Sequence, residues 1–306
     1  MESPTSTAVA VPALCFDACK EVLASRSAFY MTLAGLYFAP LDQAQIDSMT
    51  EGDLFAYAGE EGLLGEGFND MARYLRKRNS GTKQLLAIDY TASFGGAELW
   101  KGRSAMPVSS LFLSDSGLLY HGSRDQVYAA YRRQALDLRK DAHLPEDHLA
   151  FEFEFISILS QRAAAALEAG DAAQAIENLR LSREFIESHI IPWFRELAKL
   201  AALLVKTRFY KGVMKITEGY MLFDLGMIDD LIEEISGACP PVAQSAAVGT
   251  QAAAADGVRS AAANGVKATT TGGQAEAVGT QPAASVPEGG TAIRTTSTCM
   301  MGSDGK

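Results

Sequence analysis

The stretch FEFEFISILSQRAAAALEAGDAAQAIENLRLSREFIESHI, residues 151–190, decides the fold. Apolar residues recur along both halves at the three- and four-residue spacing of an amphipathic helix. Gly170 suits the left-handed position that ends the first helix, and Asp171 can cap the free amides of the second. We therefore predict two antiparallel helices, 151–169 and 172–190, joined by a tight turn.

Helical periodicity extends over most of the chain before Pro240. The first predicted helix covers residues 14–38, and Pro40 ends it because proline lacks the amide donor that a helix needs. The region 95–122 lacks helical spacing and is predicted to be one long ordered loop. No repeat of fixed length recurs, so a solenoid is not expected. The prediction is an all-α bundle of about ten helices, with further helices at residues 71–77, 84–94, 127–138, 194–209 and 213–235.

Composition changes sharply near the end of the last predicted helix. From Pro240 to Lys306 there is no aromatic residue and no leucine, and Ile293 is the only isoleucine. Such a segment cannot bury enough apolar surface to offset the entropy of ordering its backbone. It could be a recruitment arm, but a tolerated low-complexity extension is the favoured interpretation. We predict a flexible N-terminus (1–13), a single globular helical domain (14–238) and a disordered Ala/Gly/Thr-rich tail (239–306).

The net charge of −10 and the pI of 5.0 argue against nucleic acid or an anionic membrane as the main partner, since both require a cationic face. An acidic chain suits a basic partner. The sequence begins without a basic signal region, and no apolar run reaches the roughly 20 residues of a membrane-spanning helix. We expect a cytoplasmic protein without stable membrane insertion. Cys15 and Cys19, one helical turn apart, are expected to be buried apolar residues because no further ligand completes a metal site.

Titratable residues gather at Pro145, Glu146, Asp147 and His148, directly before the long apolar helix. Pro145 fits the first turn of that helix, where the helix dipole favours negative charge. Helix-start stabilisation is one interpretation, and a polar site for a cationic peptide or ligand is the other. Catalysis by His148 with Asp147 is not expected, because adjacent residues of a helical turn point about 100° apart and no nucleophile motif accompanies them.

Metal and nucleotide sites of the common kinds are not predicted. None of His121, His143, His148 and His189 follows a glutamate by three residues, as a di-metal helical bundle requires. Neither phosphate-binding glycine motif occurs. The predictions are therefore no catalytic residue, no metal ligand and no cofactor.

A second feature is His189, Pro192 and Trp193, in which the proline must kink or break a helix. Trp193 then either fills the kink as a core residue or lies with His189 at the rim of a groove. Trp100 lies in the predicted loop, where an exposed aromatic side chain would suit peptide binding.

These residues lie within longer blocks, namely MPVSSLFLSDSGLLYHG, VYAAYRRQAL, LPEDHLAFEFEFISIL, FIESHIIPWFREL and KTRFYKG. The order and spacing of the blocks resemble the TorD/DmsD family of redox-enzyme maturation chaperones, which includes nitrate reductase delta-like assembly proteins. The resemblance covers about residues 20–235. It implies an all-helical, non-enzymatic chaperone for the N-terminal signal region, possibly of the twin-arginine type, or the apo form of a molybdopterin-containing oxidoreductase, acting before cofactor insertion and export are complete.

The resemblance also implies site residues. Glu146, Asp147 and His148 match the block associated with signal-peptide binding, and the acidic pair would face arginines of the peptide. Three further sets match other blocks: Pro107 and Ser110 for the same groove, Tyr90 and Phe94 for an aromatic motif, and His189, Pro192 and Trp193 for a supporting role. Ser93 departs from the leucine usual in the aromatic motif.

Two other functions stay open from sequence alone. The chain could be a permanent structural subunit of a reductase complex, or a small helical enzyme that binds a metal. It could act as a monomer or as a dimer that exchanges helices.

Overall fold

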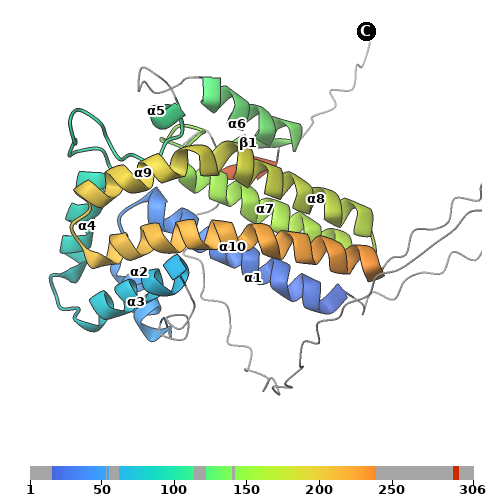
Figure 1. Cartoon of the computed structure of the whole chain (residues 1–306), viewed down its shortest axis with the longest axis horizontal. Helices are drawn as coiled ribbons and strands as arrows, with labels where there is room; N and C mark the ends of the chain where they lie inside the picture. The colour runs from blue at the N-terminus through green and yellow to red at the C-terminus, as the bar shows by residue number, and fades with distance from the viewer. Residues whose placement is uncertain are drawn as a thin grey trace, which may run out of the picture. The chain divides into compact units, whose positions relative to one another are not determined.

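The computed structural model describes residues 16–52, 54, 62–113, 122–139, 142–238 and 292–295, and these form an all-α domain with one very small sheet (Figure 1). The predicted fold class is confirmed. The elements, in chain order, are α1 (Asp17–Phe38), α2 (Gln43–Glu51), α3 (Gly62–Arg76), α4 (Thr82–Ser93), α5 (Ser110–Leu113), α6 (Gly122–Arg133), β1 (Leu136–Leu138), α7 (Leu149–Glu168), α8 (Ala172–Phe185), the π-helical turn η2 (Ile186–Ile190), α9 (Ile191–Leu204), α10 (Arg208–Ala238) and β2 (Ile293–Thr295).

The α7–α8 hairpin has the predicted turn. Gly170 adopts a positive φ of 76°, and the Asp171 carboxylate accepts a hydrogen bond from the Gln174 amide at 2.9 Å. All five residues of α7 from Phe151 to Phe155 are buried, the two glutamates included, because α1 and α8 pack on different sides of this helix (Figure 1). A helix that is buried on several sides belongs in the centre of a bundle.

A buried polar network joins four helices across the core. Arg26 of α1 pairs with Asp224 of α10 through hydrogen bonds of 2.6 and 2.7 Å, and both side chains are inaccessible to solvent. The remaining guanidinium donors reach Ser160 of α7 and Ser182 of α8, while Tyr30 donates to Asp224. Both charged groups of this ion pair therefore make further hydrogen bonds to polar side chains, as a buried pair requires.

Helices α3 and α10 approach closely because glycines face each other. A Cβ atom at Gly67 would lie 2.7 Å from the Gly212 carbonyl oxygen, and one at Gly212 would lie 2.6 Å from the Gly67 carbonyl oxygen. A side chain at either position would force the two backbones apart.

Two predicted elements differ from the structure, and one helix of the structure was not predicted. Residues 127–138 were expected to form one helix, but α6 ends at Arg133, Ala135 takes a positive φ of 53°, and residues 136–138 form β1. The predicted loop 95–122 contains the short helix α5. Helix α2 was not predicted; Asp42 and Gln45 form a capping box at its start.

Four described residues of the C-terminal segment also differ from expectation. Strand β2 pairs antiparallel with β1, with Leu138 opposite Ile293 and Leu136 opposite Thr295. Local sequence could not indicate this, because the partner strands are separated by more than 150 residues of chain. The rest of the predicted tail, the whole of the predicted N-terminus (1–13) and Cys15, Cys239 and Cys299 lie outside the described residues.

Within the described ranges, no helix is both long enough and apolar enough to cross a membrane. The same residues contain no cluster of three or more His, Cys, Asp or Glu side chains that could hold a metal ion. Cys19 is buried, as predicted.

Candidate functional site

The Pro145–His148 segment forms a turn before α7, here called the motif turn. The His148 amide donates to the Pro145 carbonyl at 3.0 Å, and α7 begins only at Leu149. His148 caps the helix: its Nδ1 accepts a hydrogen bond from the Ala150 amide at 3.2 Å. The prediction that Pro145 occupies the first helical turn is therefore wrong, because the imidazole caps the helix three residues later.

His148 is buried and uncharged at neutral pH. Burial lowers the pKa of its imidazole to about 3. A neutral ring has an acceptor nitrogen, which the cap requires, whereas a protonated ring has only donors. The imidazole thus serves the backbone of α7 and has no access to a solvent-borne ligand.

Asp147 binds the segment that leads into α5. Its Oδ2 accepts hydrogen bonds from the Ser110 amide at 2.8 Å and the Ser109 hydroxyl at 3.0 Å. Backbone bonds run beside it: the Ser109 amide donates to the Asp147 carbonyl, and the Leu149 amide donates to the Pro107 carbonyl. The structure therefore brings Pro107 and Ser110 against the motif turn, with Asp147 as the joining group.

Asp147 was expected to face a peptide's arginines beside Glu146, but its side chain is fully buried. Glu146 alone of the pair reaches the surface, with 22% of its side chain exposed. Two hydrogen bonds of 2.6 and 2.7 Å link its carboxylate to the guanidinium of Arg124 on α6. These bonds lower the pKa of Glu146 and keep it ionised.

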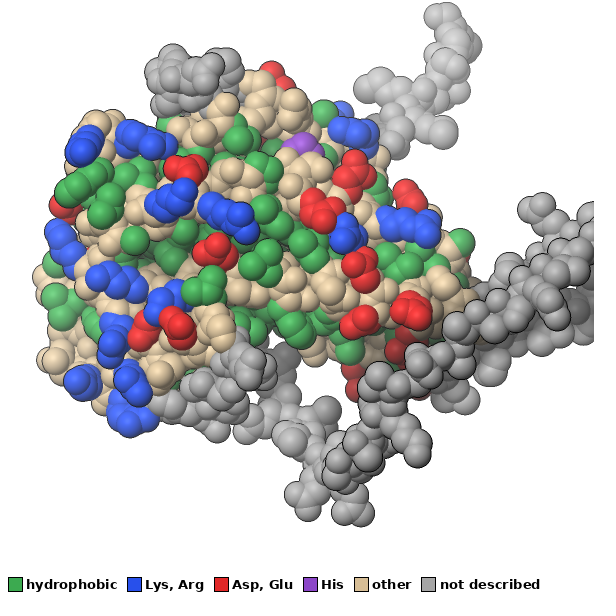
Figure 2. Space-filling view, in the orientation of Figure 1, with side chains coloured by type: hydrophobic (Ala, Val, Ile, Leu, Met, Phe, Trp, Pro, Cys, Tyr) green, Lys and Arg blue, Asp and Glu red, His purple; other side chains and the backbone are tan. Residues whose placement is uncertain are grey.

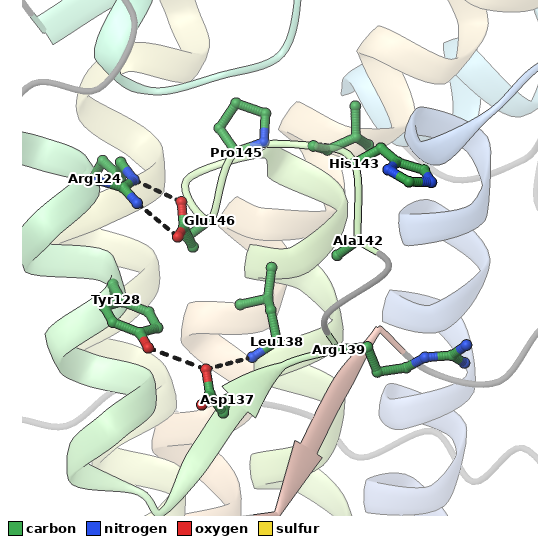
Figure 3. A pocket seen from close by; sticks show the side chains of 10 residues that line it. Arg124, Tyr128, Asp137, Leu138, Arg139, Ala142, His143, Pro145 and Glu146 are labelled. Carbon is green, nitrogen blue, oxygen red and sulfur yellow. Dashed lines mark hydrogen bonds and ion pairs between the residues drawn. The ribbon is translucent and has the colours of Figure 1, made fainter.

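A cavity of 320 Å³ lies beside this ion pair (Figure 3). Its walls come from α6, β1 and the residues that lead into the motif turn. In Figure 3, Arg124 and Tyr128 project from α6 toward Glu146 and Asp137, and the Tyr128 hydroxyl donates to Asp137 at 3.1 Å. The cavity is lined by Arg124, Tyr128, Asp137, Leu138, Arg139, Ala142, His143, Leu144, Pro145 and Glu146.

Behind the motif turn lies a buried acidic group. Glu152 is inaccessible to solvent, and neither of its carboxylate oxygens has a hydrogen-bond partner among the residues that the structure describes. Burial, with a smaller contribution from Asp147, raises its pKa well above the ordinary value. The direction of this shift favours the uncharged carboxyl group, as burial without an ion-pair partner does.

Trp193 supports α5 from the other side. Its ring is buried and stacks on Phe112 of α5 at 5.7 Å between centroids, and its indole N–H donates to the His189 carbonyl at 2.7 Å. Pro192 lies exposed in the first turn of α9, directly after η2, so the expected break is a π-helical turn inside a continuous helical path. The position of Trp193 agrees with the packing interpretation.

Tyr90 and Phe94 belong to a buried aromatic cluster. The Tyr90 hydroxyl donates to the Tyr37 carbonyl at 2.7 Å, and the Phe94 ring lies 5.6 Å from that of Tyr210. Neither residue lines the cavity. Trp100 is exposed, as expected for its loop.

Several cavity residues were not singled out from the sequence. The residues around Arg124 and Asp137 in the sequence do not indicate a binding site, because the partners of both side chains are set by the packing of α6 and β1 against the motif turn. His143 is exposed at the cavity and immediately precedes the block Leu144–His148. Its proximity to that block was the one available indication.

Residues 61–199 match the family model described as nitrate reductase delta subunit. The chaperone protein TorD of Vibrio cholerae serotype O1 is 24% identical over 214 residues, which cover 68% of this chain and 94% of that protein. The TorD chaperone of Shewanella loihica is 25% identical over 212 residues, covering 65% of this chain and 91% of that protein. No solved structure matches. The all-helical fold and these matches agree with the resemblance of the chain to the TorD/DmsD family of chaperones.

Proposed function

We propose that this chain is a cytoplasmic chaperone for a molybdopterin-containing oxidoreductase. It binds the N-terminal signal region of that client, the apo form, or both, and assists cofactor insertion and assembly before export. Support comes from the family, whose relatives are named as chaperones, and from the cavity at the motif turn.

The observation that carries the proposal is the Arg124–Glu146 pair at the cavity. A guanidinium and a carboxylate joined by two parallel hydrogen bonds form a specific pair, and an arginine of a client peptide offers the same planar fork. Exchange of Arg124 for a client arginine replaces one such pair with another. The net cost is therefore small, and lysine is a poorer substitute because it lacks the fork.

Asp147 and His148 take an indirect part in this proposal. Asp147 holds residues 107–113 against the motif turn, and His148 caps α7 directly after it. Both fix the backbone that presents Glu146. Tyr90 and Phe94 are assigned to core packing, and His189, Pro192 and Trp193 to the support of α5.

Binding of the apo form requires a larger surface than one cavity. Apolar side chains lie exposed among charged ones on the face over α9 and α10 (Figure 2). Leu203 of α9 and Leu222 and Phe223 of α10 are each about half exposed. Exposed apolar side chains of this size suit an incompletely folded client.

The test is co-production of this chain with a candidate client, a molybdopterin oxidoreductase from the same genome. We expect a higher molybdenum content per client when the chain is present, and the chain should be absent from the mature enzyme after purification. Equal molybdenum content with and without the chain would contradict the chaperone function.

The description of the matching family as a subunit favours a second candidate. In that case the chain stays bound as a structural component of the reductase. Co-purification with the mature, cofactor-loaded enzyme in equal ratio would support this candidate over transient chaperoning.

A further inference from the structure

The C-terminal residues 292–295 occupy a defined position against the domain. Strand β2 pairs with β1, and the Arg139 amide donates to the Ala292 carbonyl at 2.6 Å. Ile293 is only 3% exposed and packs within the core. Ile293, the only isoleucine in the sequence of residues 240–306, is thus buried.

Glu154 of α7 completes the contact with the backbone of this strand. Its carboxylate is buried, with Oε1 accepting from the Ile293 amide at 3.0 Å and Oε2 accepting from the Ala292 amide at 3.1 Å. Burial raises the pKa of Glu154, and these two amides act in the opposite direction. The carboxylate recognises two successive backbone amides, which any extended peptide without proline there can supply.

Side chains of the strand supply selectivity. Ala292 is partly buried and Ile293 enters the core, whereas Arg294 is exposed and lies opposite Asp137 in the ladder. Facing residues of opposite charge stabilise a strand pair. The site therefore fits an extended peptide with a small residue, a branched aliphatic residue and a basic residue in that order.

We propose that the edge of β1 and the Glu154 carboxylate form a peptide-binding site, which residues 292–295 of this chain occupy and which an extended segment of the same pattern can enter when they leave. Asp137 and Leu138 belong both to β1 and to the wall of the cavity beside Glu146. The site is thus next to the cavity but does not depend on it. A tethered occupant competes at a high effective concentration, so external peptide is excluded while the tail is bound.

The test uses the full-length chain and a labelled peptide of residues 289–298, GGTAIRTTST. Fluorescence anisotropy compares the wild type with Ile293→Asp, which places a charge in the core and expels the strand, and with Val286→Asp as a matched tail control. We expect Ile293→Asp to bind the peptide at least about tenfold more tightly than the other two proteins, because the tethered competitor is removed. The same peptide with aspartate in place of isoleucine should not bind.

Two further variants localise the effect. Adding Glu154→Gln to Ile293→Asp should weaken binding at least about tenfold, because the new amide group presents donors to a backbone donor. Ala292→Pro removes one donor without adding charge, and it replaces Ile293→Asp if circular dichroism shows that the latter loses helicity. Equal binding by the wild type and the released variant, or no binding by a folded released variant, would overturn the proposal. Neither result bears on the client, because the probe is the chain's own sequence.

Discussion

Asp147 accepts a hydrogen bond from the Ser110 amide at 2.8 Å, although 37 residues of chain separate them. This bond, with that from Ser109, holds residues 107–113 beside the turn that presents Glu146 to the cavity. Asp147, which was expected to contact the client directly, instead fixes the backbone around Glu146, the residue proposed to make that contact.

Asp147→Ala should destabilise the domain by roughly 2 to 4 kcal/mol, because two buried donors lose their acceptor. Ser109→Ala removes only one of these bonds and should cost about 1 kcal/mol. Hydrogen exchange should rise at residues 107–113 in Asp147→Ala well before global unfolding. Unchanged exchange in that segment would contradict the positioning role.

His148 predicts a pH dependence of stability. Its pKa is about 3 in the folded state and about 6.5 in the unfolded chain, so the unfolded chain binds the proton between these values. The stability contributed by the neutral imidazole is complete above pH 6.5 and is lost as the pH falls toward 3. His148→Asn keeps a capping acceptor without this titration.

Urea denaturation of the wild type and His148→Asn from pH 7 to pH 4 measures this effect. As the pH falls below 6, the free energy of unfolding of the wild type should decrease relative to that of His148→Asn. The relative decrease should be up to about 1.4 kcal/mol per pH unit. Glu152 and Glu154 contribute with the opposite sign, since their raised pKa values favour the folded state as the pH falls, but they act equally in both proteins. Parallel pH curves for the two proteins would exclude a buried neutral His148.

The buried Arg26–Asp224 pair predicts a large effect of a small change. Asp224→Asn leaves the guanidinium uncompensated inside the core and should cost about 3 to 5 kcal/mol of unfolding free energy. Asp229→Asn, five residues along the same helix, alters the solvent-exposed pair with Arg183 and should cost less than about 1 kcal/mol. Similar costs for the two variants would contradict the buried network.

The approach of α3 and α10 predicts opposite effects for two glycine substitutions in one helix. Gly212→Ala should destabilise the domain by about 1 to 3 kcal/mol, because the new methyl group meets the Gly67 carbonyl. Gly226→Ala has open space around it and should stabilise α10 by up to about 1 kcal/mol. Thermal unfolding of both variants tests these two predictions. If Gly212→Ala leaves the stability unchanged, α3 and α10 lie farther apart than the structure shows.

The parts of the structure that could be predicted are those set by neighbouring residues. Gly170 and Asp171 mark the α7–α8 turn, and apolar spacing gives the helices that surround it. The contacts that could not be predicted join distant residues: Arg26 with Asp224 across 198 positions, and Glu154 with Ile293 across 139. Nothing in the local pattern of either residue specifies its partner.

The candidate site likewise has a part that could be predicted from the sequence and a part that could not. The motif turn was recognisable as a block, so Glu146, Asp147 and His148 were all named in advance. Which of the three is exposed depends on the 107–113 segment and on α6, which pack over Asp147 and pair with Glu146. Burial of this kind is a property of the tertiary structure.

The central proposal is that Glu146 receives an arginine of the client in place of Arg124. Titration calorimetry with a peptide of the signal region of the candidate client, a molybdopterin oxidoreductase from the same genome, tests it most directly. Glu146→Gln should weaken binding at least about tenfold, whereas Arg124→Ala should strengthen it because the internal competitor is removed. Glu196→Gln, on an exposed carboxylate paired with Lys199, is the matched control and should bind as the wild type does. Equal affinity for Glu146→Gln and the wild type would contradict the account.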